Sequence, residues 1–284
     1  MTSSNPRNLR TTIRQRLSSH YQAAEADNIA ALIIEHFLGI PNTMQLVDRE
    51  TTLNEQTNLQ LQEVLARLEN HEPIQYVLGH MEFYGRRFKT DQRGLIPRPE
   101  TEELVQMVIN EGYDQKRTLL DIGTGSGCIA ITLALETGAR VYALDVQPQA
   151  LQLAYENAAS LGASVEFVLA DFLQESPDLP PLDAIISNPP YVPEQDLASL
   201  EKRVKSFEPL TALLVPDRNP LLFYEKIAAW APDHLKPGGQ VFLEIYHTAG
   251  PSVMNLFRGS HWSQVSIKKD LQGKDRMVNA SLKN

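Results

Sequence analysis

The sequence predicts an α/β protein whose largest part is a mostly parallel sheet with helices on both faces. Three observations support this fold class. From Thr118 onward, short apolar runs typical of buried strands alternate with helical patterns, which is the order that builds a parallel sheet. Residues 8–72 show helical periodicity and no strand pattern. Between these parts, residues 73–96 bring aromatic and β-forming residues together with glycines that mark turns.

Length and composition are those of a soluble globular protein. A chain of 284 residues predicts about two domains, each able to bury a core. Hydrophobic residues make up 42% and charged residues 21%, both ordinary values. The single cysteine, Cys128, excludes a disulfide framework and a multi-cysteine zinc site. The seven histidines show no metal-ligand spacing, so we expect no metal.

The charge balance and the N-terminal sequence restrict the partners and the compartment. Lysine and arginine total 26 against 35 acidic residues, giving a net charge of −9, which argues against broad binding to a phosphate backbone. Residues 1–10 are polar and lack the apolar core of a signal peptide. The most apolar early run, residues 29–40, is interrupted by Glu35 and His36 and is too short to span a bilayer. We therefore expect a cytoplasmic protein without membrane contact, and a monomer by default.

Residues 1–72 are predicted to form a small all-α bundle. Leu9, Ile13 and Leu17 recur at helical spacing, a second helix covers residues 29–38, and a third runs from about residue 55 to residue 69. Gly39 follows the second helix and is expected to end it. No chemical motif lies here, so we expect a substrate-recognition module.

Residues 73–96 are predicted to form a hairpin connector with turns at Gly79 and Gly85. Basic residues gather in and just after it, namely Arg86, Arg87, Lys89, Arg93 and Arg98. They are either a solvated face or a contact strip for a partner, and the sequence does not choose between the two. Two prolines, Pro97 and Pro99, then lead into a helix over residues 100–110 that opens the third predicted domain, residues 97–284.

The third domain is predicted element by element. Strands are expected at residues 118–122, 140–145, 165–169, 182–187 and 240–246, and helices at 127–137, 148–161 and 219–234. The tail predicts two closing strands, residues 264–267 and 276–282, on either side of Gly273.

A glycine-rich loop follows the first of these strands and opens a helix. Its residues are Gly123, Thr124, Gly125, Ser126 and Gly127. Glycines here permit a tight turn and a close approach of backbone to ligand. The dinucleotide-binding spacing is absent because position 128 is cysteine. With Asp121 at the strand end, the loop instead resembles the first motif of Rossmann-like S-adenosylmethionine-dependent methyltransferases.

Acidic residues stand at or just after the ends of the next two strands. Asp145 comes twenty residues after Gly125, where a carboxylate can accept both ribose hydroxyls of an adenosine, although it could equally cap the following helix. Asp171 and Phe172 follow the third strand. In the resembled class this place holds the adenine, which implies that Phe172 packs on the base and Asp171 lies near its amino group. By themselves they could be a capping acid and a core aromatic.

The fourth strand stops abruptly on Asn188, Pro189, Pro190 and Tyr191. Prolines cannot donate to a sheet ladder, and a residue before proline is held extended, so the Asn188 amide projects from the strand end. The Asn188 side-chain oxygen and the Pro189 carbonyl are two acceptors beside the Tyr191 ring. Such a socket suits a flat group bearing an NH2, either an amide or an exocyclic base amine. The alternative is a plain strand end with a proline turn.

This strand end, after a cofactor loop, resembles that of methyltransferases acting on planar nitrogens. Four longer stretches are similar to the release-factor glutamine methyltransferase family, namely residues 73–79, 96–102, 207–213 and 270–276. The likeness runs from about residue 70 to the end, and the preceding bundle fits the architecture of that family. Residues 208–213 are expected either to border the site or to form a buried turn.

The resemblance implies a class I methyltransferase sheet, mostly parallel with an antiparallel closing strand. It also implies S-adenosylmethionine as cofactor and N5-methylation of the glutamine in the Gly-Gly-Gln motif of class I peptide-chain release factors. Asn188, Pro189 and Tyr191 would be catalytic and, with Pro190, would bind the substrate. The cofactor would be held by residues 123–127, Asp145, Asp171, Phe172 and Asn188.

Three other functions are disfavoured by parts of the sequence. An adenine-N6 or related nucleic-acid methyltransferase uses the same socket, but the acidic charge and the lack of a basic domain argue against it. A cofactor-binding regulator without turnover would not need the intact socket. A nicotinamide oxidoreductase is disfavoured by the glycine spacing.

Overall fold

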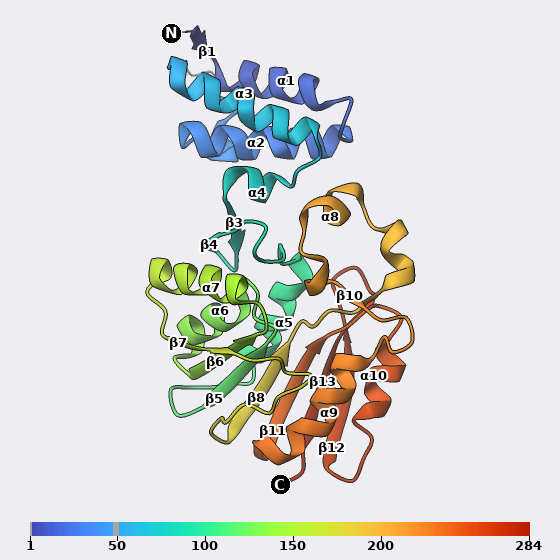
Figure 1. Ribbon diagram of the computed structural model, residues 1–284. Coiled ribbons are helices and arrows are strands. Elements are labelled where there is room, and N and C mark those ends of the chain that lie inside the picture. Colours follow the sequence, from blue (N-terminus) through green and yellow to red (C-terminus); the bar gives the residue numbers. More distant parts are fainter. Residues whose placement is uncertain (1, 48–50) are drawn as a thin grey trace. The chain divides into compact units, whose positions relative to one another are not determined.

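The computed structural model describes residues 2–47 and 51–284, which form two compact units (Figure 1). Unit 1 contains residues 1–80 and 201–207, and unit 2 contains residues 81–200 and 208–284. Within the described residues, every helix is too short or too polar to cross a bilayer.

Unit 1 is built on the three predicted helices, α1 (Pro6–Leu17), α2 (Ala23–Leu38) and α3 (Glu55–Glu69). Their apolar residues recur every three to four positions and therefore meet in one core. The core includes Ile13, Leu17, Ile29, Ile33, Ile34, Leu61, Leu65 and Leu68. The Asn54 side chain caps α3 by accepting from the Thr57 N–H at 2.7 Å, and Gly39 ends α2 with a φ of 63°.

The prediction that residues 8–72 are wholly helical is wrong in one segment. Strand β2 (Thr51–Leu53) pairs antiparallel with β1 (Thr2–Ser4), and a 3₁₀ turn, η1 (Asn42–Met44), precedes it. A three-residue strand is too short to display the alternation by which strands are recognised. Residues 48–50 of the predicted range lie outside the described residues.

The predicted hairpin begins later than expected, because residues 74–78 form a short helix, α4 (Ile74–Leu78), which Gly79 ends. The hairpin itself joins β3 (His80–Phe83) to β4 (Arg86–Lys89). Its two-residue turn has φ of 50° at Tyr84 and 69° at Gly85, the positive pair that matches the twist of the strands. A five-residue helix is too short to show a helical period in the sequence.

Unit 2 is organised around a seven-stranded sheet in the order β12-β13-β11-β8-β5-β6-β7. The strands are β5 (Thr118–Ile122), β6 (Arg140–Asp145), β7 (Val165–Leu169), β8 (Leu182–Ser187), β11 (Leu235–Glu244), β12 (Trp262–Lys269) and β13 (Asp275–Leu282). Strand β13 is antiparallel to both neighbours and the other pairs are parallel. The predicted mostly parallel sheet with an antiparallel closing strand is confirmed.

Helices cover both faces of this sheet (Figure 1). On one side lie α5 (Pro99–Ile109), α6 (Cys128–Thr137) and α7 (Pro148–Leu161). On the other, α9 (Leu222–His234) and α10 (Gly250–Leu256) pack on alternate strand residues such as Leu120 and Leu243. Helix α10 was not predicted because seven residues are too few to show a helical period in the sequence.

Several short elements lie between β8 and α9. Residues 192–193 form β9 (Val192–Pro193), which pairs in parallel with β10 (Leu214–Val215). Between them the chain forms η2 (Glu194–Ser199), α8 (Lys202–Phe207) and η3 (Leu210–Ala212). Helix α8 belongs to unit 1, where its Arg203 forms an ion pair with Glu25 of α2.

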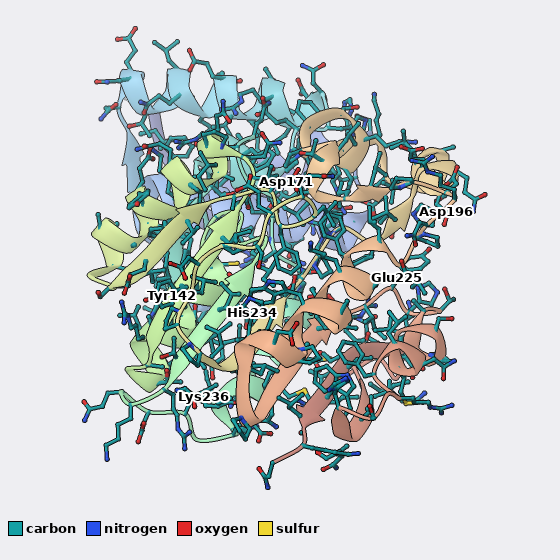
Figure 2. The ribbon with its side chains drawn as sticks, turned by 60° about the horizontal axis from the view of Figure 1, so that its bottom comes forward. Tyr142, Asp171, Asp196, Glu225, His234 and Lys236 are labelled. Atoms are coloured by element: carbon teal, nitrogen blue, oxygen red, sulfur yellow. The ribbon has the colours of Figure 1, made fainter. Side chains whose placement is uncertain are left out.

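A buried carboxylate ties strands together at the amino end of the sheet. The side chain of Asp183, only 4% exposed, accepts from Lys236 Nζ at 2.6 Å, Arg117 Nη1 at 2.8 Å and the Thr118 N–H at 2.8 Å. Figure 2 shows Lys236 at one end of the sheet and Asp171 at the other. Burial alone would raise the pKa of Asp183, but these hydrogen bonds outweigh it and lower the pKa.

We predict that Asp183→Asn destabilises unit 2 by about 2 kcal/mol at neutral pH, because charge-assisted hydrogen bonds are weakened. A group whose pKa is lowered by folding stabilises the protein above its unfolded pKa and loses that contribution as the pH falls. The difference in unfolding free energy between wild type and variant should therefore shrink below about pH 4. Urea unfolding at several pH values measures it, and a pH-independent difference would contradict the ionic origin.

Candidate active site

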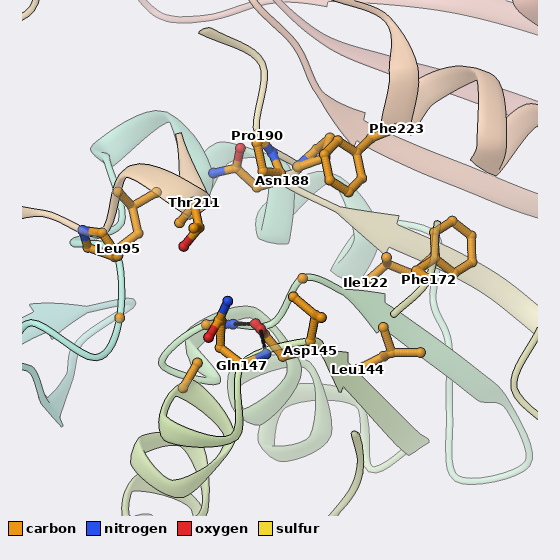
Figure 3. Close-up of a pocket in the computed structure, with 18 of the residues that line it drawn as sticks. Leu95, Ile122, Leu144, Asp145, Gln147, Phe172, Asn188, Pro190, Thr211 and Phe223 are labelled. Carbon is orange, nitrogen blue, oxygen red and sulfur yellow. Dashed lines mark hydrogen bonds between the residues drawn. The ribbon is translucent and has the colours of Figure 1, made fainter. Parts of the chain in front are cut away.

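The site lies where the order of the strands reverses. After β5 the chain builds β6 and β7 on one side, and then returns to place β8 on the other side of β5. Ligands of such sheets bind outside the carboxyl ends of the strands at this point. A cavity of about 300 Å³ opens here (Figure 3). All the residues that line it belong to unit 2.

Two glycines of the loop after β5 face open space, whereas the third does not. Gly123 and Gly125 have φ of 76° and 55°, and a Cβ on either would meet nothing within 4 Å. Both line the cavity. At Gly127, with φ of 82°, a Cβ would lie 2.8 Å from Ile131 Cδ1 and 3.0 Å from Ala154 Cβ. Gly127 therefore permits the close packing of α6 on α7, and the cavity needs only the first two glycines.

Asp145 bonds to the backbone of two neighbouring segments. Its Oδ1 accepts from the Gln147 N–H and its Oδ2 from the Gly125 N–H, each at 2.9 Å (Figure 3). The first bond forms a turn just before α7, whose N-cap is Gln147, and the second fixes the glycine loop. The carboxylate also lines the cavity, and burial raises its pKa. Each oxygen keeps further acceptor capacity for a ligand hydroxyl.

Asp171 and Phe172, which follow β7, also line the cavity. The Phe172 ring is buried and meets the ring of Trp230 edge-on, with centroids 5.3 Å apart. Asp171 Oδ1 accepts from the Leu173 N–H at 3.0 Å, so the Asp171 side chain stabilises a tight turn after β7. Phe172 is thus both a core aromatic and one wall of the cavity.

The end of β8 is locked to its neighbour and then leaves the sheet. Ser187 Oγ donates to the Ile122 carbonyl at 2.7 Å. The next residue, Asn188, is half-buried, and its Nδ2 donates to Thr101 Oγ1 of α5 at 3.3 Å. Asn188 lies across the cavity from Asp145, and Pro190 is on the same wall (Figure 3). The prolines place the Asn188 amide on the cavity wall and keep it out of the ladder.

Four of the predicted site residues do not line the cavity: Thr124, Ser126, Gly127 and Tyr191. Tyr191 lies just behind the wall, where its hydroxyl donates to Glu244 Oε1 at 3.2 Å and its N–H to the Leu213 carbonyl. Burial, followed by the charge of Glu244, raises the pKa of Tyr191. Tyr191 is consequently a neutral donor at physiological pH.

A buried ion pair joins two loops at the mouth of the cavity. Glu208, with a side chain 2% exposed, accepts from Arg98 Nη2 at 2.8 Å and from the Ile96 N–H at 3.3 Å. This holds the segment around Leu95 against the segment that carries Thr211, and both segments line the cavity. Residues 208–213 therefore border the cavity, and only Glu208 and Leu213 among them are buried.

Most of the other basic residues in and just after the connector also form ion pairs. Arg86 pairs with Glu136, Lys89 with Glu156, and Arg93 with both Asp91 and Glu156. With Arg98, four of the five are held in ion pairs within unit 2. The structure favours a solvated face over a strip kept free for an anionic partner.

Sequence reasoning missed several lining residues, among them Leu95, Gln147 and Phe223. Their side chains are apolar or uncharged and carry no motif, so the sequence contains no local signal for them. Thr101 and Glu244 were missed as well, although Thr101 stands in a stretch that the resemblance singles out.

Comparison with known proteins identifies the family. A model described as "PrmC N-terminal domain" matches residues 8–79, and one described as "Methyltransferase small domain" matches residues 100–204. A Bacteroides thetaiotaomicron protein named release factor glutamine methyltransferase is 39% identical over 271 residues, covering 95% of this chain and 97% of that protein. The chain belongs to the release factor glutamine methyltransferase family.

Another protein with this name, from Flavobacterium psychrophilum, is 36% identical over 282 residues, covering 98% of this chain and 99% of that protein. The crystal structure of a methyltransferase from Pyrococcus furiosus matches with a TM-score of 0.54 at 17% identity, covering 81% of this chain and all of that one. The predicted family and the predicted class I methyltransferase fold are both confirmed.

We predict that the two kinds of glycine in the loop of this methyltransferase respond differently to alanine. Gly125→Ala should cost about 1 kcal/mol, because a side chain is strained at positive φ but has space. Gly127→Ala should cost about 3 kcal/mol, because the new Cβ also overpacks α6 against α7. Urea unfolding followed by circular dichroism compares them, and equal costs would show that Gly127 has no packing role.

Proposed function

We propose that this enzyme transfers a methyl group from S-adenosylmethionine to the side-chain nitrogen, N5, of the glutamine in the Gly-Gly-Gln motif of class I peptide-chain release factors. Family membership supports the reaction class, since the relatives carry the name release factor glutamine methyltransferase. The observation that carries the proposal to a site is the Asn188 amide on the cavity wall. Its nitrogen is bonded to Thr101, so its oxygen is the atom that would accept from a substrate NH2.

The residues of the cavity suit S-adenosylmethionine. A volume of about 300 Å³ is that of a small-ligand pocket, and the open side of Gly123 and Gly125 admits a ligand next to backbone. Asp145 would accept the ribose hydroxyls, and Phe172 and Asp171 would border the adenine. The cofactor supplies an electrophilic methyl group on a sulfonium. Asn188 stands at the end of the same cavity, where the methyl would meet the substrate.

Catalysis would be mainly positioning. An amide nitrogen is a poor nucleophile because its lone pair is delocalised into the carbonyl. The Asn188 oxygen and the Pro189 carbonyl would accept the two N–H groups, which orients the nitrogen and favours pyramidalisation toward the methyl. Pro190 and Tyr191 would shape the slot for the amide plane. A base is not needed before attack, because the nitrogen becomes acidic once it is alkylated and then releases its proton.

We further propose a division of labour along the chain. Residues 1–72 would recognise the release factor, residues 73–96 would connect, and residues 97–284 would carry out methyl transfer in the cytoplasm, with the enzyme acting as a monomer. A nucleic-acid substrate is unsupported, since the net charge is −9 and four connector cations are already paired.

We predict that Asp145→Asn weakens S-adenosylmethionine binding about tenfold, because one ribose hydroxyl loses a charged acceptor. Isothermal titration calorimetry measures this affinity. Asp183→Asn, which changes a buried carboxylate at the far end of the sheet, is the matched control and should bind normally. An unchanged affinity in Asp145→Asn would place the ribose elsewhere.

We predict that Asn188→Ala lowers kcat about 100-fold, the typical loss when one preorganised polar contact to the reacting group is removed. Unmodified release factor and unmethylated duplex DNA are offered in parallel with labelled cofactor, and peptides are then mapped by mass. One methyl on the Gly-Gly-Gln glutamine, lost in Asn188→Ala, is the expected result. Label on DNA alone would overturn the proposed substrate, and full turnover by the variant would overturn the socket.

A further inference from the structure

A buried carboxylate lies behind the socket, where it contacts Tyr191 directly and Asn188 through Thr101. Glu244 ends β11, next to β8, and is 1% exposed. Its Oε2 accepts from the Thr101 hydroxyl at 2.7 Å, and its Oε1 accepts from the Tyr191 hydroxyl at 3.2 Å. Thr101, itself 1% exposed, also contacts Asn188 Nδ2 at 3.3 Å. A continuous chain of hydrogen bonds thus runs from Asn188 through Thr101 and Glu244 to Tyr191.

The chemistry of these groups decides which partner donates and which accepts in each of these hydrogen bonds. An ionised carboxylate can only accept hydrogen bonds, and a hydroxyl has one proton. Because the Thr101 proton goes to Glu244, Thr101 Oγ1 can only accept from its other neighbour. Asn188 must therefore turn its NH2 toward Thr101 and its oxygen away from it. The two ends of an amide have nearly the same shape, so packing alone does not select this orientation.

We infer that Thr101 and Glu244 are positioning residues that fix the orientation of the Asn188 amide, and with it the acceptor that the substrate nitrogen needs. The inference rests on the proposed role of Asn188 in binding the glutamine amide. With the amide turned over, Asn188 would present an NH2 to the substrate NH2, donor against donor. The same carboxylate holds the Tyr191 ring through its hydroxyl, so both ends of the socket share one anchor.

The surroundings of Glu244 make its ionisation sensitive to pH. Burial raises its pKa to about 7, against the hydrogen bond from Thr101, the charge of Arg276 and the hydrogen bond from Tyr191. Glu100 of α5 adds a repulsive charge, and Tyr224 of α9 donates to the Glu244 backbone carbonyl at 3.1 Å. Arg276 of β13 is itself paired with Asp270.

Once protonated, Glu244 would no longer fix which partner donates in the hydrogen bonds between Glu244, Thr101 and Asn188. A protonated carboxyl can donate to Thr101, which frees the Thr101 proton for the Asn188 oxygen and so permits the amide to turn over. Methyl transfer should therefore rise with pH through about 7 as Glu244 becomes the ionised acceptor.

The test uses the full-length enzyme with the purified release factor. Glu244→Gln keeps the size of the side chain but replaces the obligatory acceptor by a group that also donates. We expect kcat to fall about tenfold, the effect of one lost hydrogen bond, and the rise of kcat through pH 7 to disappear. The Kd of S-adenosylmethionine should not change. Asp183→Asn is the matched control, and it should keep the kcat and the pH profile of the wild type.

Thr101 provides a second test that leaves the charge in place. Thr101→Val removes the hydroxyl at constant shape and should lower kcat about tenfold, whereas Thr101→Ser restores the hydroxyl and should recover most of it. If Thr101 acts through Asn188, the loss caused by Thr101→Val should nearly vanish in an Asn188→Ala background. Should Glu244→Gln fail to fold, the valine and serine pair decides the question.

The outcomes separate this inference from the proposed function. Full turnover by Asn188→Ala would reject the socket itself. Loss of turnover in Asn188→Ala, with kcat and the pH profile intact in Glu244→Gln and Thr101→Val, would keep the socket and overturn the positioning role. Equal losses in Thr101→Val and Thr101→Ser would also overturn it, since the hydroxyl would then be irrelevant.

Discussion

The reversal of strand order between β5 and β8 is the constraint on which the rest of the site depends. It brings the glycine loop after β5 and the Asn-Pro-Pro-Tyr stretch after β8 to the same edge of the sheet, although they are far apart in sequence. The hydrogen bond from Ser187 to the Ile122 carbonyl fixes the two strand ends to each other. Because Pro189 and Pro190 cannot extend the ladder, the chain must leave the sheet at the point where a cofactor and a substrate can meet.

Two of the buried carboxylates of unit 2, Asp183 and Glu244, show how hydrogen-bond partners decide the protonation state of an acidic group. Asp183 receives two cationic donors, and its pKa is lowered. Glu244 receives hydroxyl donors, and its pKa is raised by burial. The first is suited to holding strands together across the physiological pH range. The second is suited to orienting neutral side chains, and it is poised to change protonation state near neutrality.

The elements that could be predicted from the sequence are those with a local pattern of apolar residues. Four strands, at residues 118–122, 140–145, 165–169 and 182–187, have the predicted bounds. The strands 118–122 and 182–187 are buried almost throughout and appear in the sequence as apolar runs between turn residues. Elements such as β2, α4 and α10 have too few residues for a repeating pattern to be recognised in the sequence. The contacts behind the socket could not be predicted from the sequence for another reason. Thr101 is 87 residues from Asn188 and 143 from Glu244. Only the folded sheet brings these residues together.

Helix α8 has a consequence for any attempt to dissect the molecule. The backbone passes between the two units after residues 80, 200 and 207, so they are joined by three covalent linkers. A single proteolytic cut after residue 80 would leave α8 held to α2 by contacts such as the Arg203–Glu25 pair. A fragment that ends at residue 80 would lack one of the bundle's own elements. Reorientation of one unit also requires three backbone segments to bend in concert, which restricts it more than a single tether would.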